Sequence, residues 1–156
     1  MLEDFIAKFI GSVEEESDSS IILIWELYVD GSSSEHGSGV GVLLISPKGH
    51  KIPYALRFGF KITNNEAEYE ALLAGLCLAK AVKAERLAVF SDSHLIVCQI
   101  RGEYQVKGPK MIAYLQKVQD LIRLFEGCEL NQVPMSHNSH ADALAYLASI
   151  GDADSL

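Results

Sequence analysis

Four acidic residues in this chain stand in apolar stretches, and their type points to metal chemistry. They are Asp30, Glu68, Asp92 and Asp142. A carboxylate in such a setting carries a desolvation cost of several kcal/mol unless a positive group meets it. A cation shared by all four would meet that need. Hard divalent ions such as Mg²⁺ prefer oxygen ligands and keep part of their water shell, which suits the hydrolysis of a phosphate ester.

Three of the four acids also have ordinary structural explanations. Asp30 precedes a Gly-Ser pair and is a candidate for a turn at the end of a strand. Asp92 follows an apolar run and precedes a predicted helix, so it is a candidate helix cap. Asp142 falls in the first turn of the last predicted helix, where an acid compensates the helix dipole. All three nevertheless lie at the same kind of place, the rim of one predicted sheet.

Glu68 has the weakest structural explanation. The positions four, seven and eleven residues further on share its face of the predicted helix, and they hold Leu72, Gly75 and Ala79. A glutamate therefore heads a packing stripe. Its neighbours Glu66 and Glu70 are expected on the opposite side of the helix, as a solvated or helix-start pair.

The elements that must position these acids follow from apolar periodicity and turn residues. Their order is three strands, a helix, a strand, two helices, a strand and a helix. This order predicts an α/β fold with a mixed five-stranded sheet, in which an antiparallel meander is joined by parallel strands and helices cover both faces. The predicted strands span 25–30, 39–46, 51–60, 87–91 and 129–133, and the helices span 65–83, 93–101, 110–125 and 139–149.

Length and composition indicate one domain, because the chain has 156 residues of which 49% are hydrophobic. Residues 1–20 are expected to form an acidic leader or interdomain tether with a short helix over 2–10, residues 21–150 the folded domain, and residues 151–156 a tail. No apolar run approaches the roughly 20 residues that cross a bilayer, and the chain start lacks the basic end of a secretory signal. An intracellular protein with no membrane partner is predicted.

The net charge of −8 argues at first against a nucleic-acid partner, because phosphate binding depends on Lys and Arg. The charge is unevenly placed. Residues 1–24 carry six acids and one lysine, a net of −5, which leaves −3 for residues 25–156. Two bound Mg²⁺ would bring this main part of the chain to about +1, which weakens the objection.

Four short motifs contain the four acids. They are Asp30-Gly31-Ser32, Thr63-Asn64-Asn65-Glu66-Ala67-Glu68, Ser91-Asp92-Ser93 and Asn138-Ser139-His140-Ala141-Asp142, and a Gly-rich stretch over 37–43 follows the first. In these motifs and their order, over about residues 25–149, the chain resembles type 1 ribonuclease H. More narrowly, through the second motif, the segment Gly102–Lys107 and the leader Asp4–Ala7, it resembles the ribonuclease H region of plant gypsy-type LTR retrotransposon Pol polyproteins.

The resemblance implies a ribonuclease H-like fold and hydrolysis of the RNA strand of RNA/DNA hybrids by two Mg²⁺ ions, for which Mn²⁺ substitutes. Asp30 would bridge both ions, Glu68 and Asp92 would complete one, and Asp142 would complete the other. The implied partners are the hybrid and adjacent reverse transcriptase and integrase domains. The implied location is cytoplasmic, in a virus-like particle, or nuclear.

The same motifs imply substrate-binding residues. Asn64 and Asn65 would read the sugar edge of the hybrid, where the 2′-hydroxyl distinguishes RNA, although Asn65 is also a candidate helix cap. Asn138 either orients the site or caps the last helix, and the cap is the favoured interpretation. His137 is a candidate auxiliary residue in the loop where many family members carry a mobile histidine, and His140 is an alternative. The remaining implied contacts are Gly31, Ser32 and Ser93.

The chain also departs from the family pattern. Several cellular members insert a basic, Trp-containing handle where this chain has a short loop with Arg101, Lys107 and Lys110. Weak, salt-dependent binding of the hybrid by the isolated domain is therefore expected. Two alternatives stay open: a free-standing cellular ribonuclease H, and a catalytically silent domain of this fold that acts as a tether or binding module.

Overall fold

A computed structural model describes residues 22–151 of the chain. The predicted leader over 1–20 and its helix lie outside the described residues, and so does the predicted tail except for Gly151. The elements are β1 (Ile24–Ser34), β2 (Gly37–Ile45), β3 (Lys51–Phe58), α2 (Asn64–Ala81), β4 (Arg86–Ser91), α3 (His94–Ile100), α4 (Pro109–Ile122), β5 (Gly127–Gln132), the short 3-10 helix η1 (Met135–His137) and α5 (Ser139–Ile150).

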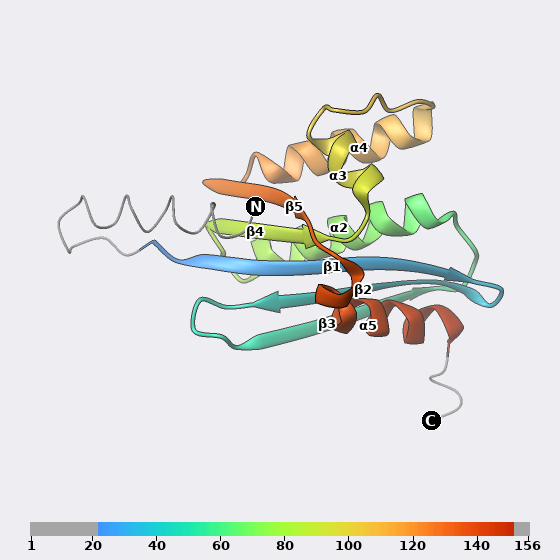
Figure 1. Cartoon of the computed structure of the whole chain (residues 1–156), viewed down its shortest axis with the longest axis horizontal. Helices are drawn as coiled ribbons and strands as arrows, with labels where there is room; N and C mark the ends of the chain where they lie inside the picture. The colour runs from blue at the N-terminus through green and yellow to red at the C-terminus, as the bar shows by residue number, and fades with distance from the viewer. Residues whose placement is uncertain (1–21, 152–156) are drawn as a thin grey trace.

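The five strands form one mixed sheet in the order β3-β2-β1-β4-β5 (Figure 1). The pairs β1–β2 and β2–β3 are antiparallel, whereas β1–β4 and β4–β5 are parallel. The helix α2 packs on β1 and β2 and also contacts α4, and α5 packs on β1, β2 and β3. The predicted fold class is therefore confirmed, with a meander of three strands extended by two parallel ones.

Alternate residues of β1 separate the two faces of the sheet. Leu27 and Val29 belong to the main core, beneath α2. Tyr28 faces the other way and stacks on Phe90 of β4, with ring centroids 4.8 Å apart. Within α2 the predicted packing stripe is confirmed, because Leu72, Gly75 and Ala79 are all buried. The stripe therefore aims the first turn of α2, and Glu68 with it, at β1.

Glycines let two helices lie directly on the sheet. A Cβ at Gly31 would collide with the α2 backbone at Ala67, and a Cβ at Gly41 would collide with the α5 backbone at Ala141. Asp30 is paired with Gly41 in the β1–β2 ladder. The close approach of both helices therefore places their first turns beside Asp30.

The first strand is longer than predicted. The sequence indicated a strand that ends at Asp30 and a Gly/Ser-rich turn after it, but β1 continues to Ser34. Gly31 to Ser34 pair with Val40 to Gly37 of β2, so the turn is reduced to Glu35 and His36. Ladder hydrogen bonds and helix packing override the turn propensity of this stretch.

The start of α2 also differs from the prediction. Glu66 is buried, with 7% of its surface exposed, and it is not solvated. It forms a capping box with Thr63, which is the helix cap in place of Asn65, and it pairs with Lys110 of α4. Glu70 accepts a hydrogen bond of 2.6 Å from the Tyr114 hydroxyl. Both glutamates therefore fasten α4 to α2.

The Glu66–Lys110 pair predicts a pH-dependent contribution to stability. Lys110 and the Thr63 backbone hold the pKa of Glu66 below its ordinary value. A depressed pKa stabilises the folded state above the unfolded pKa, and the benefit is lost as the pH falls through the folded value. Lys110→Met is expected to lower the free energy of unfolding by about 1 kcal/mol at pH 7.

Urea denaturation at pH 7 and at pH 3 tests this expectation. Protonation of Glu66 removes its charge interaction with Lys110, so the difference between the two proteins should become smaller as the pH falls. Lys117→Met, on the same helix, is the control, because Lys117 is exposed and has no ion pair among residues 22–151. An undiminished difference at pH 3 would contradict the assignment.

The two edge strands carry features that interrupt further pairing. On β5, the guanidinium of Arg101 donates to the Leu130 carbonyl oxygen, with the shorter contact at 2.6 Å. On β3, Pro53 lies inside the strand, opposite Leu43 of β2. Proline has no N–H to offer to another strand.

Candidate active site

Three of the four predicted acids converge at one point. Asp30 lies in β1, Asp92 directly follows β4, and Glu68 lies in the first turns of α2. One carboxylate oxygen from each of the three lies within 4.8 Å of the others. The parallel register pairs Val29 with Ser91, which sets Asp30 and Asp92 side by side at the carboxyl end of β4. Ligand sites of open α/β sheets lie at such strand ends.

Glu68 reaches the cluster because its helix touches β1. Its Oε1 accepts a hydrogen bond of 2.5 Å from the backbone N–H of Gly31. The same glycine lies against the α2 backbone at Ala67 and Glu68, where any side chain would separate strand and helix. Gly31, a predicted substrate contact, therefore has a structural role in seating Glu68 beside Asp30.

Asp142 lies in the first turn of α5, as predicted. It is close enough to Asp30 for a carboxyl–carboxyl hydrogen bond, which contributes to the raised pKa of Asp30. Among the described residues, the tight cluster comprises Asp30, Glu68 and Asp92 without Asp142. The structure therefore places Asp142 at the margin of the group of acids.

Burial and mutual repulsion raise the pKa values of the clustered acids. Burial is the largest cause for Asp30, and its hydrogen bond and charge interaction with Glu68 add to it. Burial also raises the pKa values of Glu68 and Asp92, to which the charge of Asp142 contributes. Three ionised carboxylates in this space repel one another, and a bound cation relieves that repulsion. The all-oxygen donor set fits a hard divalent ion such as Mg²⁺.

Asn138 ties α5 to this cluster. Its Nδ2 donates to the Val29 carbonyl oxygen at 2.9 Å and to Asp92 Oδ2 at 3.3 Å, and the residue is 1% exposed. Its side chain makes no capping hydrogen bond to α5. Asn138 therefore occupies the N-cap position of α5, as the favoured interpretation expected, but its amide is used across the sheet, where it positions Asp92.

Asn138→Asp tests that positioning role at nearly constant volume. The change removes both N–H donors and adds a charge beside Asp92, so the free energy of unfolding is expected to fall by roughly 2–3 kcal/mol without divalent ions. Urea denaturation in EDTA at pH 7 measures it. Asn64→Asp is the matched control, because Asn64 is exposed and should tolerate the change. Equal losses in the two variants would argue against the assignment.

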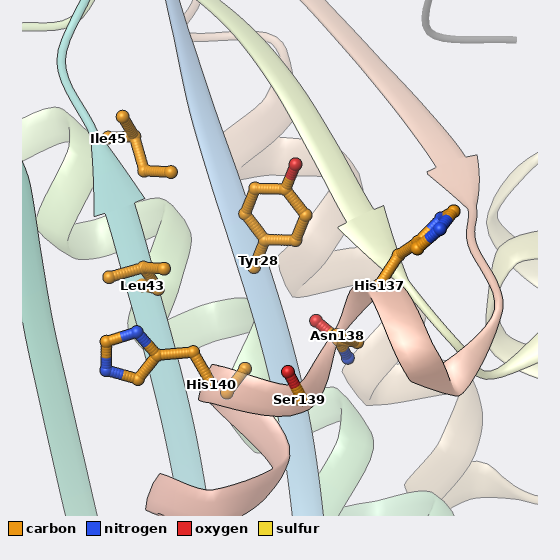
Figure 2. Close-up of a pocket in the computed structure, with 8 residues that line it drawn as sticks. Tyr28, Leu43, Ile45, His137, Asn138, Ser139 and His140 are labelled. Carbon is orange, nitrogen blue, oxygen red and sulfur yellow. The ribbon is translucent and has the colours of Figure 1, made fainter. Parts of the chain in front are cut away.

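The remaining predicted site residues differ in their positions relative to the acid cluster. Asn64 and Asn65 are exposed first residues of α2, and Ser32 continues β1 beyond Asp30. Ser93 is the helix cap of α3, accepting from the Ile96 N–H at 3.3 Å. His137 lies in η1 and lines a cavity on the α5 side of the sheet, shown in Figure 2, and does not belong to the acid cluster.

Two features next to the cluster were not found from the sequence. His94, two residues after Asp92, contacts Gln132 Oε1 at 2.9 Å and the Tyr104 hydroxyl at 3.1 Å, which ties α3 to β5 and to the loop before α4. A groove of about 660 Å³ separates the start of α2 from that loop. It is lined by Thr63, Asn65, Glu66, Gln99, Gln105, Lys107, Lys110 and Met111. Of these residues, Asn65 was a predicted substrate contact, and Lys107 and Lys110 gave a local signal as cations in a short loop.

Comparison with known proteins identifies the family. The model of the reverse transcriptase-like family matches residues 28–148. The chain belongs to this family. Ribonuclease HI of Halobacterium salinarum is 30% identical over 120 residues, which are 76% of this chain and 60% of that protein. A bifunctional protein of Mycobacterium tuberculosis is 39% identical over 85 residues, which are 54% of this chain and 23% of that protein. The chain therefore spans about a quarter of that relative's length.

Solved structures agree with this assignment. The N-terminal RNase H domain of the M. tuberculosis protein, solved as a fusion with maltose binding protein, has a TM-score of 0.78 and 30% identity, covering 86% of this chain and 99% of that one. RNase H1 of Halobacterium salinarum also has a TM-score of 0.78, at 29% identity over 83% and 99% of the chains. LC11-RNase H1, solved in complex with an RNA/DNA hybrid, has a TM-score of 0.72 and 28% identity, with 80% and 95% covered.

Within residues 22–151, no helix combines the length and the apolar character that crossing a bilayer requires.

Proposed function

We propose that this chain hydrolyses the RNA strand of RNA/DNA hybrids with two divalent metal ions. The observation that carries the proposal is the convergence of Asp30, Glu68 and Asp92 oxygens within 4.8 Å, beside Asp142. The family relationship supports it, since a similar protein was solved in complex with an RNA/DNA hybrid. Hydrolysis by this route needs no side-chain nucleophile.

The four acids would have different roles in binding the metal ions. Asp30, Glu68 and Asp92 would hold the ions, with Asp30 as the ligand common to both, and Asp142 would contribute from the margin of the cluster. When bound, such ions activate a water and stabilise the leaving oxygen of the phosphate ester. Asn138 holds Asp92 in place through its Nδ2, and the Gly31 N–H fixes one oxygen of Glu68.

Substrate positioning falls to the surface around the start of α2. Asn64 and Asn65 expose their amides next to the turn that carries Glu68, where they would meet the 2′-hydroxyl edge of the RNA strand. The groove between α2 and the loop before α4 offers Lys107 to the phosphates of the paired strand. Lys110 lies in the same groove, but its charge is partly engaged by Glu66.

Lys107→Ala is expected to weaken binding of the hybrid by a similar factor for every sequence tested. It should also reduce the slope of log affinity against log salt by about one, as for the loss of one phosphate contact. Fluorescence anisotropy across a series of KCl concentrations, with Ca²⁺ in place of Mg²⁺, measures both. Lys48→Ala is the control, because Lys48 is exposed in the β2–β3 turn. An unchanged slope would remove Lys107 from the interface.

The biological setting is also a proposal. The motifs shared with plant gypsy-type elements support an origin as the ribonuclease H part of a retroelement polyprotein, next to reverse transcriptase and integrase. In that setting residues 1–20 are the tether, residues 21–150 are the catalytic domain and residues 151–156 are a tail. The location that follows is intracellular, in a cytoplasmic virus-like particle or in the nucleus.

Cleavage of a labelled 20-base-pair RNA/DNA hybrid is the direct test of the function. The wild type is expected to cut the RNA strand with Mg²⁺ or Mn²⁺, to stop in EDTA and to leave DNA duplex intact. Asp92→Asn should abolish cutting while retaining the fold by circular dichroism. Binding of the hybrid without cleavage in either metal, at low salt, would instead favour a catalytically silent binding domain.

A further inference from the structure

A cavity of about 130 Å³ lies on the sheet face that α5 covers, beyond the first turn of that helix (Figure 2). Its floor is made by Tyr28 of β1 with Leu43 and Ile45 of β2. Its other wall is the chain from His137 to Ala141, which ends η1 and begins α5. The cavity is thus apolar on the sheet side and polar on the helix side.

The helix side presents free hydrogen-bond donors. Helix α5 has 12 residues, and its first intrahelical bond runs from the Asp142 N–H to the Asn138 carbonyl. Within the described chain, the N–H groups of Ser139, His140 and Ala141 have no hydrogen-bond partner, because the Asn138 side chain does not cap them. Such N–H groups and the helix dipole favour an anion. The Ser139 hydroxyl is a further donor.

A second observation points to a ligand at the same place. Asn138 lines the cavity and is 1% exposed, and its Oδ1 has no hydrogen-bond partner among the described residues. The Nδ2 is committed to Val29 and Asp92, so the amide cannot turn to exchange its two ends. Figure 2 shows the Asn138 oxygen on the side that faces Tyr28. A buried acceptor without a donor is costly, and a ligand that brings an O–H would satisfy it.

We propose that this cavity binds a protonated phosphate group, either inorganic phosphate or a phosphate monoester. Oxygen atoms of the ligand accept from the α5 N–H groups and Ser139, and its P–O–H donates to Asn138 Oδ1. Sulfate has similar size and shape but carries no proton at neutral pH, so Asn138 selects against it. The space of about 130 Å³ accommodates a group of this size.

The charges around the cavity set the expected strength. The carboxylate of Glu26 interacts with the Tyr28 hydroxyl, and Asp142 shares the first turn of α5. Among residues 22–151, no Lys or Arg lines the cavity. Binding is therefore expected in the millimolar range, at about 4 kcal/mol. Through Asn138, the same ligand is linked to Asp92, because one amide group contacts both.

The proposal does not depend on hydrolase activity, so its test is a binding measurement. Amide chemical shifts of ¹⁵N-labelled full-length protein are followed at pH 7 in EDTA, with potassium phosphate or potassium sulfate at matched ionic strength. Phosphate is expected to shift the Ser139, His140 and Ala141 signals saturably, and sulfate at least tenfold more weakly. Absence of a saturable phosphate shift, or equal effects of the two anions, overturns the proposal.

Ser139→Ala supplies the matched variant. Alanine keeps the backbone conformation at the start of α5, and with it the position of Asn138, while the hydroxyl donor is lost. Phosphate affinity should fall about fivefold in this variant and stay unchanged in Ser136→Ala, whose site does not line the cavity. Equal affinities in Ser139→Ala and the wild type would also overturn the assignment.

A pair of dinucleotides, one with a 5′-phosphate and one with a 5′-hydroxyl, then identifies the source of the group. They are compared at pH 6, where about half of the 5′-phosphate keeps its proton. Shifts at residues 139–141 with the 5′-phosphate compound alone show that the cavity accepts a nucleic-acid end. If inorganic phosphate binds and neither dinucleotide does, the ligand is the free anion. Both results support a phosphate site, whereas equal binding of the two dinucleotides would contradict recognition of the phosphate.

Discussion

Replacing Asp30 with asparagine is expected to make the metal-free protein more stable and nearly inactive. Asp30 is 6% exposed and lies within reach of Glu68, Asp92 and Asp142. Its ionised form is opposed by burial and by these acids, and for that reason its pKa is raised. Asparagine keeps the shape and removes the charge, so the free energy of unfolding should rise by roughly 1–3 kcal/mol in EDTA at pH 8.

The activity of the same variant should fall by about 10³-fold or more, equivalent to about 4 kcal/mol of transition-state stabilisation, if Asp30 holds the metal ions as proposed. The opposite signs of the two effects separate a metal ligand from a structural residue, whose loss would lower both quantities. Urea denaturation and initial rates of hybrid cleavage measure them. A variant that is both less stable and still active would contradict the assignment.

The pH dependence of the wild type follows from the same cluster. A carboxyl whose folded pKa is raised binds its proton more tightly in the folded state, so it costs stability once the pH rises above its unfolded value. Without metal, the stability attributable to Asp30 should decline with rising pH, and millimolar Mg²⁺ should restore it. In Asp30→Asn both the decline and the effect of Mg²⁺ should be smaller, which thermal melts from pH 5 to pH 9 would show.

Gly41→Ala is expected to have the second large effect. A Cβ at this position would overlap the Ala141 carbonyl and crowd the Ala145 N–H, so α5 must move off the sheet. The expected loss is roughly 3 kcal/mol in free energy of unfolding. Activity should fall with it, because α5 carries Asp142 and begins next to Asn138, the residue that positions Asp92.

Gly59→Ala is the control for that substitution. The nearest atom to a Cβ there is an Arg57 guanidinium nitrogen at 4.0 Å, and the backbone is outside the left-handed region. Stability should stay the same or rise slightly, as the unfolded chain loses freedom. Urea denaturation and hybrid-cleavage rates of Gly41→Ala and Gly59→Ala test this expectation. If both glycine variants lost equal stability, close packing of α5 on β2 would not be the cause.

The order of elements could be predicted because each has a local pattern. The strand β4 is a short apolar run, and α2 repeats apolar residues at helical spacing from Leu72 onward. The length of β1 could not be predicted, because Gly31 to Ser34 have the composition of a turn. They are extended only because β2 pairs with them and α2 rests on Gly31. The residues that extend this strand are thus distant from it in the sequence, so its own composition does not reveal its length.

The candidate site likewise has features that local sequence patterns predict and features that depend on distant parts of the chain. Local patterns indicate the positions of Asp92, which follows the apolar run of β4, and of Glu68, which shares a face with the apolar residues of α2. Asp30 joins them from inside β1, which is paired with β4. The burial of Glu66 depends on Lys110, which comes from another helix. The direction of Asn138 depends on the Val29 carbonyl and Asp92, from two strands. Such partners appear only when the chain has folded, because no spacing in the sequence links them.

The edges of the sheet have a consequence for behaviour at high concentration. A five-stranded sheet with open sides can recruit strands from other molecules and grow into aggregates. Here the Leu130 carbonyl on one side is already occupied by Arg101, and Pro53 on the other side lacks the N–H that a newcomer would need. Both edges of the sheet are thus closed to strand addition at these points, which favours separate molecules over aggregates at high protein concentration.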